Sequence, residues 1–131
     1  MMTHLQQCRY FLRKRAEQRQ AQLDLFFERA WKEARAIIDL LIAKYRPVRV
    51  YQWGSLLDRS RFWERSDIDI AVEGILAPAT FFAMYGEADQ LASVTLDLVA
   101  LERIEPEFAE IIRTTGKLVY ERDREDSYLN Q

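Results

Sequence analysis

The sequence predicts an α+β domain: a mixed sheet of about four strands, flanked by helices and preceded by a long N-terminal helix. Three observations support this fold class. Residues 3–45 contain neither Gly nor Pro, which favours helix, and Pro47 ends that region. Short segments rich in Val, Ile and Leu then begin at residues 48, 66, 93 and 117, as expected for strands. Segments with helical apolar spacing separate the later strands.

The N-terminal helical region, residues 1–45, has two halves of different character. Its second half is amphipathic and is expected to cover the core, through Leu23, Phe26, Phe27, Ala30, Trp31, Ala34, Ile37, Ile38 and Leu41. The first half carries a short apolar stripe, Leu5, Cys8, Phe11 and Leu12, followed by a polar, basic run. One helix, or two helices with a break, both fit this pattern. Residues 3–15 either contact a partner or a second copy of the chain, or form a docked terminal helix.

The remaining elements follow in order, and we expect one domain, 1–131, with its core at 48–121. A strand at 48–53 leads through Gly54 into a short helix that ends near Arg59, and a second strand spans 66–72. A helix at 79–91 is expected to bury Phe81, Phe82, Met84, Tyr85, Ala88 and Leu91. A strand at 93–100, a helix at 106–114 ended by Gly116, and a strand at 117–121 complete the domain. The tail, 122–131, is predicted to be solvated.

Two aspartates in the second predicted strand are the first sign of a functional site. Side chains alternate along a strand, so Asp67 and Asp69 project from one face while Ile68 and Ile70 project from the other. Aspartate is a poor strand former, and a broken local rule of this kind is typical of a functional site. Two such carboxylates repel unless a cation lies between them, and Mg²⁺ is the usual cation at carboxylates that also meet phosphates.

The preceding turn supplies the other half of such a site. Gly54 lets a phosphate approach the backbone, and the N–H groups that open a helix after Ser55 favour anions. Arg59, Arg61 and Arg65, in the basic loop, are candidates for charge-assisted hydrogen bonds to a triphosphate. In the same loop, Phe62 and Trp63 are expected to pin the loop to the core rather than to stack on a base.

These residues resemble the pattern of the nucleotidyltransferase superfamily that includes DNA polymerase beta, and within it the minimal nucleotidyltransferase (MNT) family. That pattern is Gly-Ser, a spacer, Asp-x-Asp and a third acidic residue on a later strand. The matching residues here are Gly54, Ser55, Asp67, Asp69 and Asp97. The resemblance implies the nucleotidyltransferase fold, with Asp67, Asp69 and Asp97 as catalytic residues that bind two Mg²⁺ ions, and with Gly54 and Ser55 at the outer phosphates of ATP.

The resemblance also implies an acceptor. MNT proteins act as antitoxins of small helical HEPN ribonuclease toxins and transfer AMP to a toxin tyrosine, so the expected partners are ATP and a HEPN-type toxin, in a hetero-oligomer. Two alternatives stay open. One is an antitoxin that neutralises its partner by binding alone. The other is a small-molecule, aminoglycoside-type nucleotidyltransferase, whose acidic pocket would draw on Glu64, Glu73 and Glu102.

Composition limits the remaining possibilities. The chain has 131 residues, 49% of them hydrophobic, and a net charge of −2, which gives no general reason to expect binding to nucleic acid or membrane. A single cysteine, Cys8, cannot form an internal disulfide. No apolar run approaches the ~20 residues that span a bilayer. We therefore expect a cytoplasmic protein.

Overall fold

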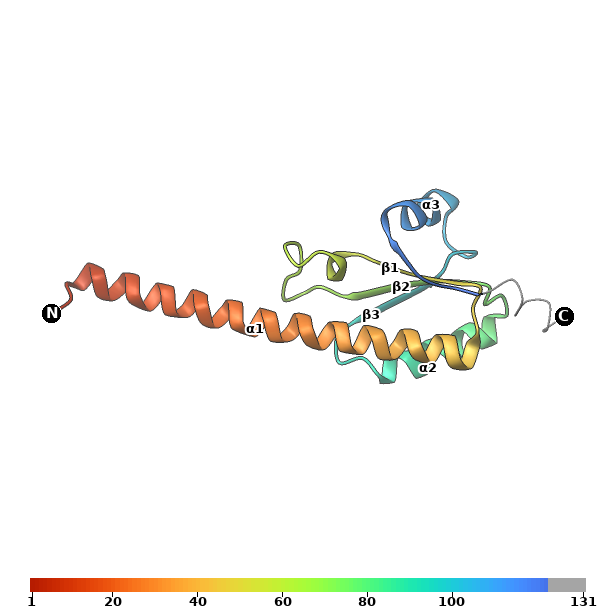
Figure 1. Cartoon of the computed structure of the whole chain (residues 1–131), viewed down its shortest axis with the longest axis horizontal. Helices are drawn as coiled ribbons and strands as arrows, with labels where there is room; N and C mark the ends of the chain where they lie inside the picture. The colour runs from red at the N-terminus through yellow and green to blue at the C-terminus, as the bar shows by residue number, and fades with distance from the viewer. Residues whose placement is uncertain (123–131) are drawn as a thin grey trace.

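A computed structural model describes residues 1–122 of the chain. A four-stranded sheet lies at its centre, in the order β3-β2-β1-β4. The strands are β1 (Arg49–Trp53), β2 (Ile68–Glu73), β3 (Leu96–Ala100) and β4 (Lys117–Glu121). Three α-helices accompany them: α1 (His4–Leu40), α2 (Pro78–Gln90) and α3 (Pro106–Thr115). The predicted α+β fold class, with a mixed sheet and a long N-terminal helix, is confirmed (Figure 1).

The N-terminal region is one unbroken helix rather than two. A capping box starts α1: the Thr3 side chain accepts from the backbone N–H of Gln6, and the Gln6 side chain accepts from that of Thr3. The helix continues for 37 residues and ends in a single π turn at Leu41–Tyr45. Arg46 then adopts a left-handed backbone conformation, and Pro47 prevents further helix.

The sheet is mixed because its strands pair in two directions. Strand β1 runs antiparallel to both of its neighbours, β2 and β4. Strands β2 and β3 are parallel, and α2 makes the crossover that a parallel pair requires. The parallel register places Asp97 directly beside Asp69, and the antiparallel register places Trp53 on the other side of Asp69.

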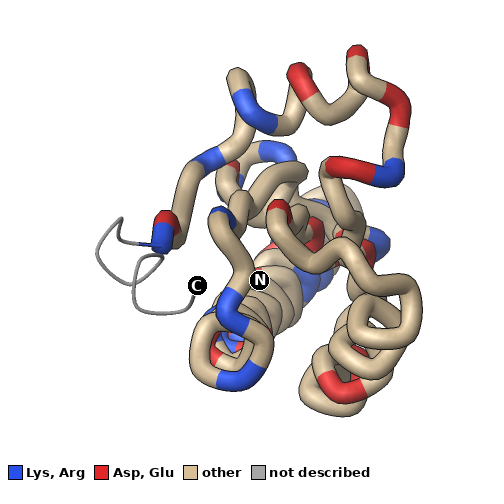
Figure 2. The backbone as a smooth tube through the Cα atoms, turned by 90° about the vertical axis from the view of Figure 1, so that its right-hand side faces the viewer, with Lys and Arg blue, Asp and Glu red and all other residues tan. Residues whose placement is uncertain are grey.

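Helices cover both faces of this sheet. On one face, α1 and α2 pack on a large apolar cluster, and on the other α3 packs on a smaller one; Figure 2 shows the resulting layers. Ile68, Ile70 and Val72 belong to the large cluster, whereas Ala71 belongs to the small one. Asp69 alternates with Ile68 and Ile70 and therefore faces the α3 side.

Several predicted boundaries differ from the structure. Strand β2 begins at Ile68, so Asp67 lies just before it, and β3 begins at Leu96 rather than 93. The short helix predicted from Gly54 to Arg59 is only a 3₁₀ turn, Ser55–Leu57. Nearly all of the predicted solvated tail, 122–131, lies outside the described residues.

The predicted burial of α2 is wrong in two places. Met84 and Ala88 are buried, but Phe82 and Leu91 are 69% and 43% exposed. Phe82, within α2, and Leu91, the C-cap residue that follows it, are therefore largely outside the core that α2 shares with α1 and the sheet. Within residues 1–122, no helix is long and apolar enough to cross a membrane.

The packing of α1 on the sheet gives a stability prediction. Ala34 is fully buried where α1 crosses the sheet, whereas Ala36 lies on the exposed side of the same helix. Ala34→Leu should lower the free energy of unfolding by about 1–3 kcal/mol, because the core has no room for a larger side chain. Ala36→Leu is the matched control and should change it by less than about 0.5 kcal/mol. Urea denaturation measures both, and equal effects would contradict this packing.

Candidate active site

Three carboxylates gather at one end of the sheet, on the α3 face. Asp69 lies in β2 and is only 8% exposed, and its register partner in β3 is Asp97. Asp67 precedes β2 by one residue and projects to the same side as Asp69. Strand β3 shows the predicted alternation, with Leu96 and Leu98 buried and Asp97 on the opposite side. The parallel pairing of β2 with β3 therefore brings together all three predicted catalytic aspartates.

Electrostatics confirm that the three carboxylates are close enough to act on one another. Burial, followed by the charges of Asp97 and Asp67, raises the pKa of Asp69 to about 7. Burial and the charge of Asp67 also raise the pKa of Asp97. Asp69 consequently holds a proton at a pH where ordinary aspartates are ionised, and a cation bound among the carboxylates would counteract the charges of Asp97 and Asp67 that help to raise its pKa.

The backbone of Gly54 forms the wall beside Asp69. Gly54 has a φ of +86°, which side chains other than glycine rarely adopt. A Cβ atom added there would lie 2.1 Å from Oδ2 of Asp69. Only glycine therefore fits between the end of β1 and the carboxylate, so the Gly-Ser turn and the aspartate pair form one site, as the sequence pattern predicted.

Ser66 holds the two ends of the intervening loop together. Its buried hydroxyl accepts from the Ser55 hydroxyl at 2.8 Å and from the backbone N–H of Trp63 at 2.9 Å. Ser55, which directly follows Gly54, is thus held in place by the residue that precedes Asp67. Because Ser55–Leu57 is a single 3₁₀ turn, phosphate contacts there would come from individual N–H groups rather than from a long helix dipole.

The loop aromatics behave differently from each other. Phe62 is 3% exposed and packs against Phe26 and Phe27 of α1, with ring centroids 5.1 and 5.0 Å away. The prediction that it pins the loop to the core is confirmed. Trp63 is 53% exposed, so the same prediction is wrong for Trp63.

The loop arginines also separate into different environments. Arg59 forms an ion pair with Asp24 of α1 and lies over the ring of Phe27, 5.3 Å from its centroid. Arg65 is exposed. Arg61, the third of the predicted loop arginines, lines a cavity that also contacts Gly54. No local sequence signal distinguishes Arg61 from Arg59, because the Asp24 that engages Arg59 lies far away in the chain.

That cavity lies between the end of β1, the loop and α3, and has a volume of about 390 Å³. Its lining is Trp53, Gly54, Leu57, Asp58, Arg61, Phe108, Ile111, Ile112 and Thr115. Trp53 and Phe108 meet edge to face, with centroids 5.6 Å apart. The cavity is on the same face of the sheet as Asp69, and its charged lining residues are Arg61 and Asp58. Its aromatic walls suit a ligand with a flat ring, and Arg61 can meet a negatively charged group of that ligand.

Within residues 1–122, no three acidic, histidine or cysteine side chains form a preformed metal-binding group. The donors that Asp69 and Asp97 offer are nevertheless carboxylate oxygens on adjacent strands, the ligand type that hard divalent cations prefer. In donor chemistry the cluster fits such a cation.

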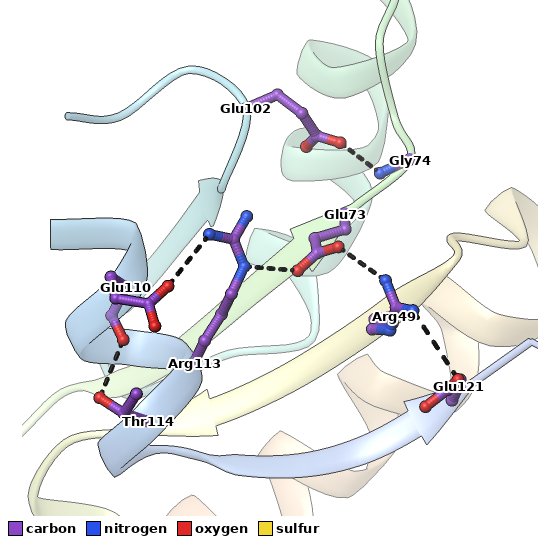
Figure 3. Close-up of polar contacts among 8 residues, drawn as sticks. All are labelled: Arg49, Glu73, Gly74, Glu102, Glu110, Arg113, Thr114 and Glu121. Atoms are coloured by element: carbon purple, nitrogen blue, oxygen red, sulfur yellow. Dashed lines mark hydrogen bonds and ion pairs between the residues drawn. The ribbon is translucent and has the colours of Figure 1, made fainter. Parts of the chain in front are cut away.

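The glutamates considered for an acidic drug-binding pocket do not join the site. Glu73 ends β2, four residues and about 13 Å along the strand from Asp69. Its carboxylate pairs with Arg49 at 3.1 Å and Arg113 at 3.0 Å, and Glu102 accepts from the N–H of Gly74, as Figure 3 shows. Glu64 is exposed in the loop. Two of the three thus serve contacts at the other end of the sheet.

Comparison with known proteins agrees with this geometry. The family model described as "Polymerase beta, Nucleotidyltransferase" matches residues 35–125. No characterised protein sequence matches the chain.

Chains in three solved structures have a similar fold. One comes from a toxin–antitoxin complex with AMP-PNP (23% identity, 71% of this chain and 77% of that chain covered, TM-score 0.54). Another comes from the toxin–antitoxin complex MntA-HepT (22%, 75% and 78%, TM-score 0.53). The third comes from a tri-AMPylated Shewanella oneidensis HEPN toxin in complex with an MNT antitoxin (23%, 76% and 78%, TM-score 0.52).

The contact between Gly54 and Asp69 predicts a strong response to a single methyl group. Gly54→Ala should lower the free energy of unfolding by about 1–3 kcal/mol, because Ala is strained at this φ and its Cβ overlaps the Asp69 carboxylate. Gly86→Ala is the matched control, since a Cβ there has no neighbour within 4 Å and α2 should gain up to ~1 kcal/mol. Thermal unfolding compares the two variants. A Gly54→Ala protein as stable as wild type would contradict the geometry.

The raised pKa of Asp69 predicts a pH dependence of stability. The folded protein holds a proton on Asp69 up to a pH of about 7, whereas the unfolded chain releases it near 3.8. This contribution to stability is complete below the unfolded value and is lost as the pH rises towards 7. In metal-free buffer, wild type should lose roughly 2–4 kcal/mol relative to Asp69→Asn across this range. Urea denaturation at several pH values tests this, and a constant difference between the two proteins would contradict it.

Proposed function

This chain belongs to the polymerase beta nucleotidyltransferase family, and from that membership and the site we propose that it transfers AMP from ATP to a hydroxyl group of a partner protein. The observation that carries the proposal is the register of β2 and β3, which aligns Asp69 with Asp97 beside the backbone of Gly54. Carboxylates that share a buried face, next to a turn that leaves room for phosphate, are suited to phosphoryl-type chemistry.

In the proposed reaction, the acceptor oxygen attacks the α-phosphorus of ATP. A bond forms between that oxygen and phosphorus, and the bond from the α-phosphorus to the bridging oxygen of the β-phosphate breaks, so pyrophosphate leaves with the electron pair. Asp97 takes the proton of the attacking hydroxyl; its raised pKa supports this role. Gly54 and Ser55 position the outer phosphates, and exclusion of a side chain at Gly54 keeps the approach open.

We propose Mg²⁺ as the cation, bound by Asp67, Asp69 and Asp97. Two such ions would neutralise negative charge on the triphosphate and on the leaving pyrophosphate. The three carboxylates place their oxygens on one face and must be ionised to bind the cation. Without a counter-charge, burial and the charges of Asp97 and Asp67 oppose ionisation of Asp69. Asp69 should therefore lose its proton when Mg²⁺ and nucleotide bind.

The cavity beside Gly54 is the proposed seat of the nucleotide. Arg61 lies where it would meet a phosphate or ribose oxygen, and Trp53 and Phe108 offer apolar walls to the remainder. Arg59 and Arg65 stay predictions as nucleotide-binding residues. Arg59 can bind a phosphate only if its ion pair with Asp24 breaks; if the ion pair persists, Arg59 instead anchors the loop to α1.

We propose that the acceptor is a HEPN-type toxin, with a tyrosine as the modified residue, and that this chain is its antitoxin. Support comes from the neighbouring folds, one of which lies in a complex with a tri-AMPylated HEPN toxin and one in a toxin–antitoxin complex with AMP-PNP. The three aspartates in one cluster favour catalysis over neutralisation by binding alone. The absence of Glu73 and Glu102 from the site weighs against an aminoglycoside-type acceptor.

The test is transfer of label from ATP carrying its isotope on the α-phosphate. Wild-type protein with Mg²⁺ should label the HEPN-type protein encoded beside it, on tyrosine. The double variant Asp67→Asn, Asp69→Asn should reduce the rate by about 100-fold or more, equivalent to ~3 kcal/mol of lost transition-state stabilisation. Electrophoresis with autoradiography measures the rate, and mass spectrometry identifies the residue.

The matched control is Glu73→Gln, which changes a carboxylate at the far end of β2 and should leave the rate within about twofold. Equal labelling by wild type and the double variant would reject the site assignment. A tight complex without label would instead support neutralisation by binding.

A further inference from the structure

The first half of α1 extends beyond the rest of the protein as a free helix. We call residues 4–22 the arm. All of its residues are exposed, and Leu23 is the first in α1 that is even partly buried. At 1.5 Å per residue the arm is about 28 Å long, and Figure 1 shows it projecting past the sheet. The family model matches residues 35–125, so the arm lies outside the matched residues.

One side of the arm continues the side of α1 that covers the core. Leu5, Leu12 and Ala16 stand at helical spacing from Leu23, Ala30 and Leu41, separated by steps of four, seven or eleven residues. Leu5 and Leu41 are separated by about ten helical turns, so they lie on the same side. Leu5 and Leu12 are 60% and 64% exposed, whereas Leu41 is fully buried. The apolar stripe thus continues where the sheet has ended.

The arm begins at the loop that bounds the active site. Asp24 pairs with Arg59, and Phe26 and Phe27 hold Phe62, so the last contacts of α1 before the arm are with the loop between Gly54 and Asp67. A molecule seated on the apolar side of the arm would therefore stand in front of the catalytic end of the sheet.

The positive charge of the arm limits which molecules can bind its apolar side. The arm carries five basic residues, Arg9, Arg13, Lys14, Arg15 and Arg19, against Glu17 alone, while the whole chain has a net charge of −2. Two arms side by side would repel, and Arg15 and Arg19 interrupt the stripe where a helix pair would need apolar residues. A second copy is thus a poor occupant of the arm, whereas an acidic surface with an apolar row is complementary in both respects.

We propose that the arm is the docking surface for the acceptor protein and engages an acidic helical face bordering an apolar row. This rests on the proposed function, which requires a separate protein acceptor. Docking along the arm would hold the acceptor hydroxyl at the carboxylate cluster, so the arm contributes to the acceptor's KM and not to the chemical step.

The test uses full-length protein with Leu5→Glu and Leu12→Glu, which place two like charges on the stripe. We expect the KM for the HEPN-type acceptor to rise about tenfold or more, with kcat at saturating acceptor and the KM for ATP within about twofold of wild type. Gln7→Glu with Gln18→Glu is the matched control: it adds the same charge on the side of the arm away from Leu5, Leu12 and Ala16 and should leave all three values within about twofold of wild type. Circular dichroism confirms that both variants keep α1.

Calorimetric binding of the acceptor separates this inference from the proposed function. If wild type transfers no label but binds the acceptor, and the Leu5 and Leu12 changes weaken that binding, the proposed chemistry fails and the docking surface stands. If those changes leave acceptor binding and KM at wild-type values, the docking proposal is overturned.

Two other results would also overturn it and would identify a different occupant. If wild type is a dimer in light scattering, and the Leu5→Glu, Leu12→Glu variant is a monomer with an unchanged acceptor KM, the stripe binds a second copy of the chain. Binding of labelled RNA that only this variant loses, again with KM unchanged, would assign it to nucleic acid.

Discussion

The repulsion between buried carboxylates is the constraint on which this structure depends. Asp69 and Asp97 are aligned by a parallel strand pair, and Asp67 adds a third charge to both. A sheet selected for stability alone would place apolar or unlike-charged residues there. Two neighbouring features support this arrangement. Gly54, directly after β1, lets the backbone approach the Asp69 carboxylate closely. The apolar clusters on both faces of the sheet stabilise the fold against the repulsion.

Helix α1 links this site to the outside of the molecule. Its central residues build the main core, and Phe26 and Phe27 fix the loop through Phe62. The same helix then leaves the domain as the arm. One rigid element thus contacts the sheet and the loop beside the proposed nucleotide cavity, and it also carries the proposed acceptor surface. A contact made on the arm is held at a defined position relative to Asp69, which is what a transfer between two macromolecules requires.

Local patterns in the sequence were sufficient to predict the strands, the shared side of Asp67 and Asp69, and the Gly-Ser turn. Strand alternation and the backbone preferences of glycine both depend on only a few neighbouring residues. The role of Asp97 as a neighbour of Asp69 came from family resemblance, since nothing local reveals a parallel pairing across a crossover. The contact of Asp24 with Arg59 was missed for the same reason, because the two residues lie far apart in the chain. The sequence therefore did not show that, of these two predicted arginines, Arg61 lines the cavity and Arg59 does not. The exposure of Phe82 depends on how α2 is oriented against α1 and the sheet, and the spacing of apolar residues within α2 does not determine that orientation.

The most direct test of the account is the ionisation of Asp69, followed by ¹³C NMR of its carboxyl carbon as the pH is varied. The account predicts a pKa of about 7 in metal-free protein, with assignment by the Asp69→Asn variant. Addition of Mg²⁺ with a non-hydrolysable ATP analogue should lower that pKa below about 5, because cations among the three carboxylates replace repulsion with attraction. An ordinary pKa in the metal-free protein, or a raised one that Mg²⁺ and nucleotide do not change, would contradict the claim that this cluster is the catalytic centre.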